Sequence, residues 1–191
     1  MSVEDSKMIK VTSMPDEDGV AMTYELPYKA AELSEFLKDA AGDSIEEEED
    51  DDDDDDNNNN KSNDKMVTVE VSRVRGKCLG KVVEFLCHYA EEPMKEIPTP
   101  LGGSSFNEVM DQEWYQTFVA DENLGQDLLF DMLTAANFMG IKELLDLTCL
   151  KVTFQLTGKS AEEIRQILRL PELTPEEEAT ARQEHRWIFE D

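Results

Sequence analysis

Cys87 and His88 are adjacent in the sequence and could in principle supply a nucleophile and its base. A thiol needs a base within hydrogen-bonding reach to react as a nucleophile. The surrounding pattern predicts a helix, where neighbouring side chains point about 100° apart and do not face each other. We interpret Cys87 as a small buried side chain beside a surface His88. No "CxxC", "HExxH", phosphate-loop or "GxSxG" motif occurs either, so we expect no enzyme activity.

The residue types that bind metals are poorly spaced for a site. Three cysteines and two histidines are scattered along the chain, unlike the clustered ligands of a zinc site. The acidic run at residues 46–56 also fails as a calcium loop. An EF-hand requires Gly at its sixth and Glu at its twelfth position, and no frame of the run offers both. We expect neither a metal nor a cofactor.

Charge limits the classes of partner. The 191 residues carry a net charge of −27, and the run at residues 46–56 supplies eleven acids. The rest of the chain still carries −16 once those eleven charges are subtracted. Such a surface repels nucleic acids and anionic membranes and attracts basic proteins. We therefore expect protein partners, with no nucleic acid and no membrane.

The N-terminal sequence and the cysteines indicate the cellular compartment in which the protein is expected. "MSVEDSKMIK" carries acids and lacks the apolar stretch of a signal peptide. No apolar run approaches the roughly 20 residues of a membrane span. An odd, scattered set of cysteines is typical of a reducing compartment. We expect a soluble intracellular protein.

The first half of the chain predicts a small sheet. Residues 8–14 and 20–26 have strand patterns and flank the turn sequence "PDEDG", which indicates a hairpin. "KAAELSEFLKDA" predicts one helix that stops near Gly42. Residues 43–64, which contain the acidic run, have the composition of a disordered surface loop. Alternating valines at residues 67–71 predict a third strand.

The second half of the chain predicts helices. Apolar residues recur at helical spacing over residues 79–90, 128–139 and 141–156, with a weaker helix at 106–119. Ser160 with Glu163, and Thr174 with Glu177, each match a capping box. Three strands and about seven helices indicate an α+β, mostly helical fold with a small three-stranded sheet.

Four motifs in the second half resemble a known family. They are "DQEW" at 111–114, "AANFMGIKELLDLTC" at 135–149, "GKSAEEIR" at 158–165 and "LTPEEEATARQEHRW" at 173–187. In letters and spacing they are similar to the Skp-type adaptors of SCF ubiquitin ligases. The resemblance implies a BTB/POZ-like domain at 1–157, interrupted by the acidic loop, and a C-terminal helical extension at 158–191. It also implies a cytoplasmic and nuclear location.

The resemblance implies a non-catalytic adaptor that links a cullin scaffold to F-box substrate receptors. It places Asn137 and Phe138 on the cullin-facing surface. It marks Pro175 as a candidate modification site, because some protist members hydroxylate and glycosylate the matching proline. It places the F-box site on the helices around Gly158, at Leu145, Cys149, Val152, Leu156, Ile164, Ile167, Leu168, Leu170 and Trp187.

The apolar residues near the C-terminus favour a partner surface independently of the resemblance. Trp187, Ile188 and Phe189 end a helix that is otherwise strongly charged. Such a helix cannot bury them on itself, and clustered exposed aromatics mark binding surfaces. The alternative is that Trp187 folds back onto the chain's own core.

Two other functions remain open from the sequence. The acidic run could shield a basic client, as in an acidic chaperone-like protein. A BTB-like module could instead serve self-association, including a homodimer in the absence of an F-box partner. Client shielding should vanish without the acidic run and weaken steeply with salt, whereas F-box binding should survive both changes.

Deleting residues 46–60 is expected to leave the fold intact, because the run has no apolar residue to bury and loop closure costs grow slowly with length. Thermal melting of the deletion variant checks this. A large fall in Tm would mean that the run is part of the folded structure.

Overall fold

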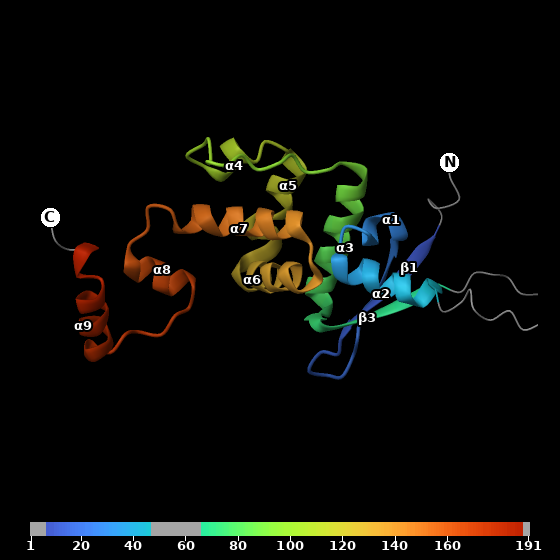
Figure 1. The fold of residues 1–191 in the computed structure, drawn as a ribbon, viewed down its shortest axis with the longest axis horizontal. Helices are drawn as coiled ribbons and strands as arrows, with labels where there is room; N and C mark the ends of the chain where they lie inside the picture. Colours follow the sequence, from blue (N-terminus) through green and yellow to red (C-terminus); the bar gives the residue numbers. More distant parts are fainter. Residues whose placement is uncertain (1–6, 47–65, 189–191) are drawn as a thin grey trace, which may run out of the picture. The chain divides into compact units, whose positions relative to one another are not determined.

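The computed structural model describes residues 7–46 and 66–188. The chain divides into two compact units, Met1–Lys151 and Val152–Asp191, whose elements are labelled in Figure 1. The expected disordered loop at residues 43–64 lies outside the described residues from 47 onward. No helix of the described ranges is long and apolar enough to span a membrane.

A three-stranded sheet forms the centre of the first unit. Its strands are β1 (Met8–Met14), β2 (Thr23–Pro27) and β3 (Val67–Arg75), in the order β2-β1-β3. Val11 of β1 lies opposite Tyr24 in the antiparallel pair and opposite Val69 in the parallel pair. The parallel pair requires a crossover, which α1 (Tyr28–Ala31) and α2 (Glu35–Glu46) provide.

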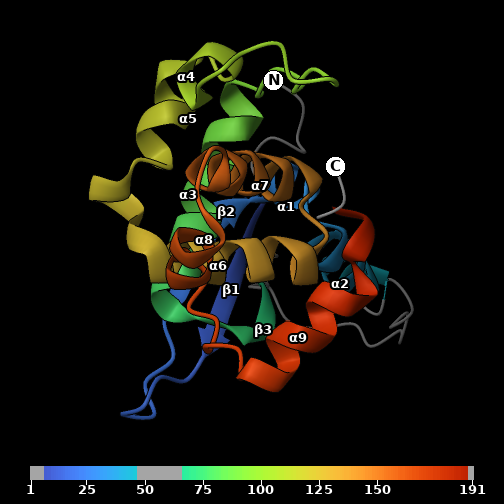
Figure 2. The same cartoon turned by 90° about the vertical axis from the view of Figure 1, so that its left-hand side faces the viewer.

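One face of the sheet is covered by helices. The helix α3 (Gly76–Glu91) contacts all three strands, and α2 and α6 (Asp121–Met139) contact β3. In Figure 2 the strands lie next to α3 and α6. Alternation along the strands turns every second side chain to the helices. The buried strand residues are Ile9, Val11, Ser13, Leu26, Val67, Val69, Val71 and Val74.

The remaining helices follow in chain order. They are α4 (Phe106–Val109), α5 (Glu113–Phe118), α7 (Lys142–Leu156), α8 (Ala161–Ile167), α9 (Pro175–Glu184) and the 3-10 turn η2 (Arg186–Ile188). The predicted fold class, α+β and mostly helical with a three-stranded sheet, is confirmed.

Several predicted boundaries were wrong. The helix predicted from Lys29 is two helices, since the chain turns at Ser34, and the weak helix at 106–119 is likewise split into α4 and α5. Gly42 does not end α2, because it does not adopt a positive φ, and the helix continues to Glu46. The second strand begins at Thr23 rather than Val20, because the amide and carbonyl of Val20 are both engaged by Asp16 in the hairpin turn.

His88 is also not a surface residue. Its side chain is 18% exposed, and its ring stacks on Trp114 of α5 with ring centroids 3.7 Å apart. The sequence pattern placed it just outside the apolar face of α3, but α5 covers that edge of the helix.

Ser34 joins the start of α2 to the end of α6. Its hydroxyl is fully buried, donates to the Met139 carbonyl over 2.7 Å and accepts from the Leu37 amide over 3.2 Å. The second bond caps α2, while the first satisfies a carbonyl that the end of α6 leaves without a helical partner.

Replacing Ser34→Ala should lower the free energy of unfolding by about 1–3 kcal/mol, because the variant loses a helix cap and leaves a buried carbonyl unsatisfied. Chemical denaturation measures the change. Ser72→Ala, on an exposed position of β3, is the control and should stay within about 0.5 kcal/mol of the parent. Equal effects of the two substitutions would contradict this role.

Candidate functional site

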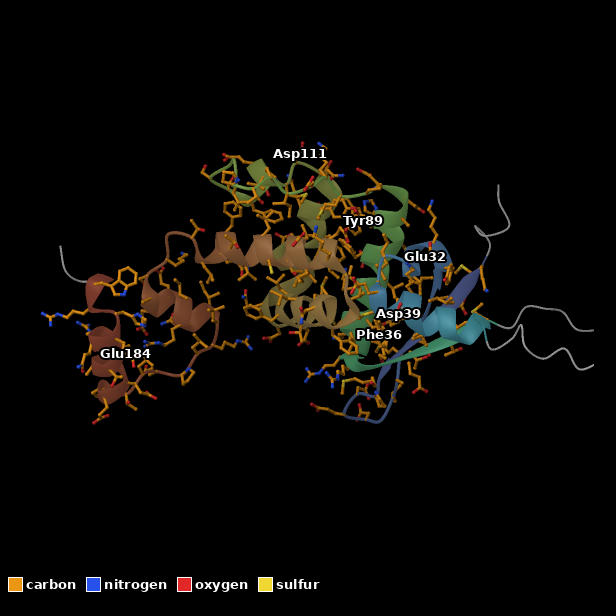
Figure 3. The ribbon with its side chains drawn as sticks, in the orientation of Figure 1. Glu32, Phe36, Asp39, Tyr89, Asp111 and Glu184 are labelled. Atoms are coloured by element: carbon orange, nitrogen blue, oxygen red, sulfur yellow. The ribbon has the colours of Figure 1, made fainter. Side chains whose placement is uncertain are left out.

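The C-terminal end of α6 presents a polar residue beside a half-buried aromatic ring. Asn137 is exposed and Phe138 is half-buried. The Phe138 ring lies 5.1 Å from the Phe36 ring of α2, tilted by 41°. The Arg73 guanidinium of β3 lies 5.5 Å from the centre of the Phe138 ring. We call Phe36, Arg73, Asn137 and Phe138 the α6 patch; Figure 3 labels Phe36 on α2.

Gly140 fixes the α6 patch. It ends α6 in a left-handed conformation, with φ 64° and ψ 40°, and its amide donates to the Ala136 carbonyl. A Cβ at this position would come within 2.8 Å of the Glu35 Cβ. Glycine is therefore required both by the turn and by the close approach of α2. The same turn starts α7 two residues later.

The α6 patch combines features of a protein-binding surface. Phe138 offers part of an aromatic face, Asn137 offers an amide, and Arg73 offers a cation that already lies near the ring. Aromatic residues and arginine are enriched where proteins bind one another. Because Phe138 also packs on Phe36, it contributes to the stability of the fold as well as to the surface.

One face of α7 carries four of the predicted F-box residues. Leu145, Cys149, Val152 and Leu156 are spaced by four, three and four residues, which places them on one side of the helix. Leu145, Val152 and Leu156 are half-buried and Cys149 is exposed. The opposite side of α7 packs into the first unit through Leu144, Leu147, Thr148 and Leu150, which are buried.

The remaining predicted F-box residues lie in the second unit. Ile164, Ile167 and Leu168 are half-buried, whereas Leu170 is 55% exposed and Trp187 is 72% exposed. Within the second unit, Trp187 is therefore not packed against a core. None of the described side chains from residue 152 through 187 is buried. Residues 152–187 thus carry apolar side chains that do not form a buried core among themselves.

Local sequence signals nevertheless define the helices of the second unit. Both predicted capping boxes are confirmed: Ser160 and Glu163 start α8, and Thr174 and Glu177 start α9. Hydrogen bonds from the amide and hydroxyl of Ser160 lower the pKa of Glu163. The same bonds from Thr174 lower the pKa of Glu177.

The end of α8 determines where Leu170 lies. Arg169 follows the helix with a positive φ of 53°, and the Leu170 amide donates to the Arg165 carbonyl over 2.9 Å. This is the geometry in which a left-handed residue closes a helix end. A segment that is neither helix nor strand then leads to Pro175, which is exposed at the first position of α9.

Sequence reasoning missed Phe36 and Arg73. Phe36 lies within the predicted helix "KAAELSEFLKDA", and Arg73 within the basic stretch "SRVRGK". Neither had a signal that pointed to Phe138, because the contact joins three elements distant in sequence. The sequence shows only that a charged residue, Arg73, takes the next place in the alternation of Val67, Val69 and Val71.

The thiols are not set up for nucleophilic chemistry. Burial, and secondarily Asp131, raises the pKa of Cys78 to about 12. Burial, followed by the nearby Glu91, also raises the pKa of Cys87. Each thiol is thus held in its unreactive protonated form near neutral pH. Within residues 7–46 and 66–188, no group of three or more His, Cys, Asp or Glu is placed to hold a metal ion.

Comparison with known proteins relates the chain to one family. Residues 142–188 match the family model described as Skp1 family, dimerisation domain. The chain is 32% identical over 157 residues to SKP1-like protein 1A of Arabidopsis thaliana, which covers 81% of this chain and 96% of that protein. The chain belongs to the Skp1 family.

Two further Skp1 relatives extend the comparison to other organisms. The S-phase kinase-associated protein 1 homolog of Tetrahymena thermophila is 37% identical over 123 residues, 64% of this chain and 72% of that protein. The E3 ubiquitin ligase complex SCF subunit sconC of Aspergillus terreus is 35% identical over 123 residues, 64% of this chain and 73% of that protein. The Skp1 family model covers α7 through η2 and begins just after the α6 patch.

The capping carboxylates predict how the second unit responds to acid. Because the pKa of Glu163 is lowered in the folded state, its contribution to α8 is present above the pKa of the unfolded chain and is lost as pH falls through the lowered pKa. Carbon-detected NMR titration of the side-chain carboxyls measures this.

Ser160→Ala should return the pKa of Glu163 toward its ordinary value and leave Glu177 unchanged, because Thr174 holds Glu177 separately. A Glu163 titration that Ser160→Ala does not move would contradict the capping account.

Proposed function

We propose that this Skp1-family protein is a non-catalytic adaptor that links a cullin scaffold to F-box substrate receptors in an SCF-type ubiquitin ligase. The observation that carries the proposal is the absence of any buried side chain among described residues 152–187, although these include exposed Leu170, Leu173 and Trp187. An extension of this kind gains stability when a partner covers its apolar side chains. A relative is named as an SCF subunit, which supports this choice of assembly.

The F-box surface is proposed to include the outer face of α7, the apolar side of α8 and Trp187. Each fully buried aliphatic side chain contributes roughly 1.5–3 kcal/mol, so covering several of them yields a substantial share of a binding free energy. Tryptophans in such a position often dominate the energetics of an interface.

The cullin surface is proposed to be the α6 patch. It lies entirely in the first unit, on elements tied together by Ser34 and Gly140. A rigid support keeps Asn137 and Phe138 in one orientation, which reduces the entropic cost of binding. The two proposed partners therefore use different residues, as an adaptor requires.

We propose a non-catalytic role because the candidate nucleophile and base, Cys87 and His88, are not arranged for a reaction. Cys87 has a raised thiol pKa, and its neighbour His88 stacks on Trp114. Cys87 and His88 were predicted not to face each other as a nucleophile and base. In the structure, burial keeps the Cys87 thiol protonated and the His88 ring packs on Trp114. The function of the protein is accordingly placed in its surfaces rather than in a reaction centre.

Reciprocal variants should separate the two surfaces. Asn137→Lys with Phe138→Ala should weaken cullin binding at least about tenfold, because it removes an aromatic contact of the α6 patch. Trp187→Ala should weaken F-box binding at least about tenfold, because it removes an exposed anchor. Surface plasmon resonance against each partner measures both effects.

Each variant serves as the control for the other, and thermal melting checks that both remain folded. Each should retain the affinity for the partner whose surface is untouched. Unchanged cullin affinity in the first variant would mean that Phe138 serves only packing. Unchanged F-box affinity in the second would remove Trp187 from the F-box surface.

Pro175 is proposed as a hydroxylation site. It is exposed at the start of α9, and its ring is held by the helix, so an enzyme can reach it without unfolding. The mass of the native peptide around Pro175 should be raised by one oxygen, or by more if a sugar follows. The unmodified mass in protein from every growth stage would contradict the assignment.

A further inference from the structure

The β1–β2 hairpin forms a hollow with the starts of α3 and α6. Its volume is about 840 Å³, within the roughly 300–1,000 Å³ range of ligand-binding sites. The lining comes from residues 14–22, 75–78 and 124–131, all in the first unit. Figure 2 shows the hairpin turn extending beyond the first turn of α3. We call this space the hairpin hollow.

The hairpin hollow exposes apolar side chains. Val20 is 57% exposed and Met22 is 39% exposed, and Leu128 of α6 lies in the same lining. Exposed apolar groups that converge on one concave surface are typical of interaction sites. Methionine is well suited to such a surface because its unbranched chain adapts to different partners.

The turn that carries Val20 is firmly held. One carboxylate oxygen of Asp16 accepts from the Asp18 amide over 3.0 Å and from the Val20 amide over 2.9 Å. The Asp16 amide donates to the Val20 carbonyl, and Gly19 adopts a φ of 77°. These bonds hold the backbone of the turn in a conformation that leaves the Val20 side chain exposed.

Met22 is held at the inner end of the hollow. A Cβ on Gly76 would come within 2.6 Å of the Met22 sulfur, so the side chain lies directly over the start of α3. Tyr24 donates its hydroxyl to the Gly76 carbonyl over 2.9 Å and lies 3.3 Å from the Met22 sulfur. The apolar floor is thus preformed, which lowers the entropic cost of binding.

The rim of the hairpin hollow is acidic. Two cations, Arg75 and Lys77, also line it, and the Arg75 guanidinium lies 3.9 Å from the Asp131 carboxylate. The acids exceed the cations by three. Such a rim attracts basic groups and repels nucleic acids and anionic lipids. The acids of the lining are Asp16, Glu17, Asp18, Asp127 and Asp131.

We propose that the hairpin hollow is a docking site for a basic segment of a protein partner, with an apolar side chain of that segment seated against Val20, Met22 and Leu128. Lysines or arginines beside that side chain would meet the acidic rim. A peptide segment supplies both kinds of group at the required spacing. This surface shares no residue with the α6 patch or with the proposed F-box surface, so the inference does not depend on the proposed function.

The test uses the full chain with carbon-13-labelled methionine methyl groups. It is titrated with a short synthetic peptide in which a leucine is flanked by lysines, and with a matched peptide that has glutamates in their place. The methyl signals of Met14 and Met22 should shift saturably with the lysine peptide only. The signals of Met94 and Met139, which are buried elsewhere, should not move.

Two variants locate the binding. Val20→Ser with Met22→Gln should weaken the lysine peptide about tenfold, because it removes the apolar contacts. Glu17→Gln with Asp18→Asn should weaken it at low salt and reduce its salt dependence. The control, Glu172→Gln with Glu176→Gln, makes the same change in net charge on exposed residues of the second unit and should bind as the parent does.

Three results would overturn the proposal. The first is saturable binding that leaves Met14 and Met22 unshifted. The second is a shift that does not saturate and spreads over all methionines, which is the behaviour of non-specific attraction to an acidic chain. The third is an equal loss of affinity in the control variant.

Discussion

The junction at Gly140 is the constraint on which the rest of the structure depends. Its left-handed turn ends α6 and allows α7 to begin, and its lack of a side chain lets α2 approach closely. The buried hydroxyl of Ser34 joins the same two helices through the Met139 carbonyl. Phe36 and Phe138 meet only because these helix ends are held together. The orientation of α7, which carries the next surface, starts from this point as well.

The two units are stabilised by different means. The first unit has a conventional core in which helices cover one face of the sheet. Residues 152–187 of the second unit include well-formed helix caps but no buried side chain. Caps specify where helices begin, yet each is worth only about 1 kcal/mol. The apolar side chains of α8 and Trp187 are thus available for a partner, at the cost of a weakly stabilised extension.

Local signals predicted the elements well where a single residue type dictates the geometry. The two capping boxes, the hairpin turn at Gly19 and the end of α6 at Gly140 follow from the chemistry of Ser, Thr, Glu and Gly. The break at Ser34 was not predictable, because it is stabilised by Met139, which lies 105 positions along the chain.

The residues of the candidate surfaces were also predictable only in part. The spacing of Leu145, Cys149, Val152 and Leu156 predicts one helical face, and the structure has that face. The resemblance supplied Asn137 and Phe138, but not their supports Phe36 and Arg73. The hairpin hollow had no sequence signal, since the exposure of Val20 and Met22 contradicts the strand pattern in which they were predicted. Contacts between elements distant in sequence account for what was missed.

The proposed adaptor function requires one chain to bind a cullin and an F-box protein at the same time on separate surfaces. Isothermal titration of an F-box protein into the protein, alone and after saturation with cullin, measures whether it does. We expect the two Kd values to agree within about twofold, as for uncoupled sites, and a complex with one copy of each component to form. Displacement of cullin by the F-box protein would rule out the adaptor function.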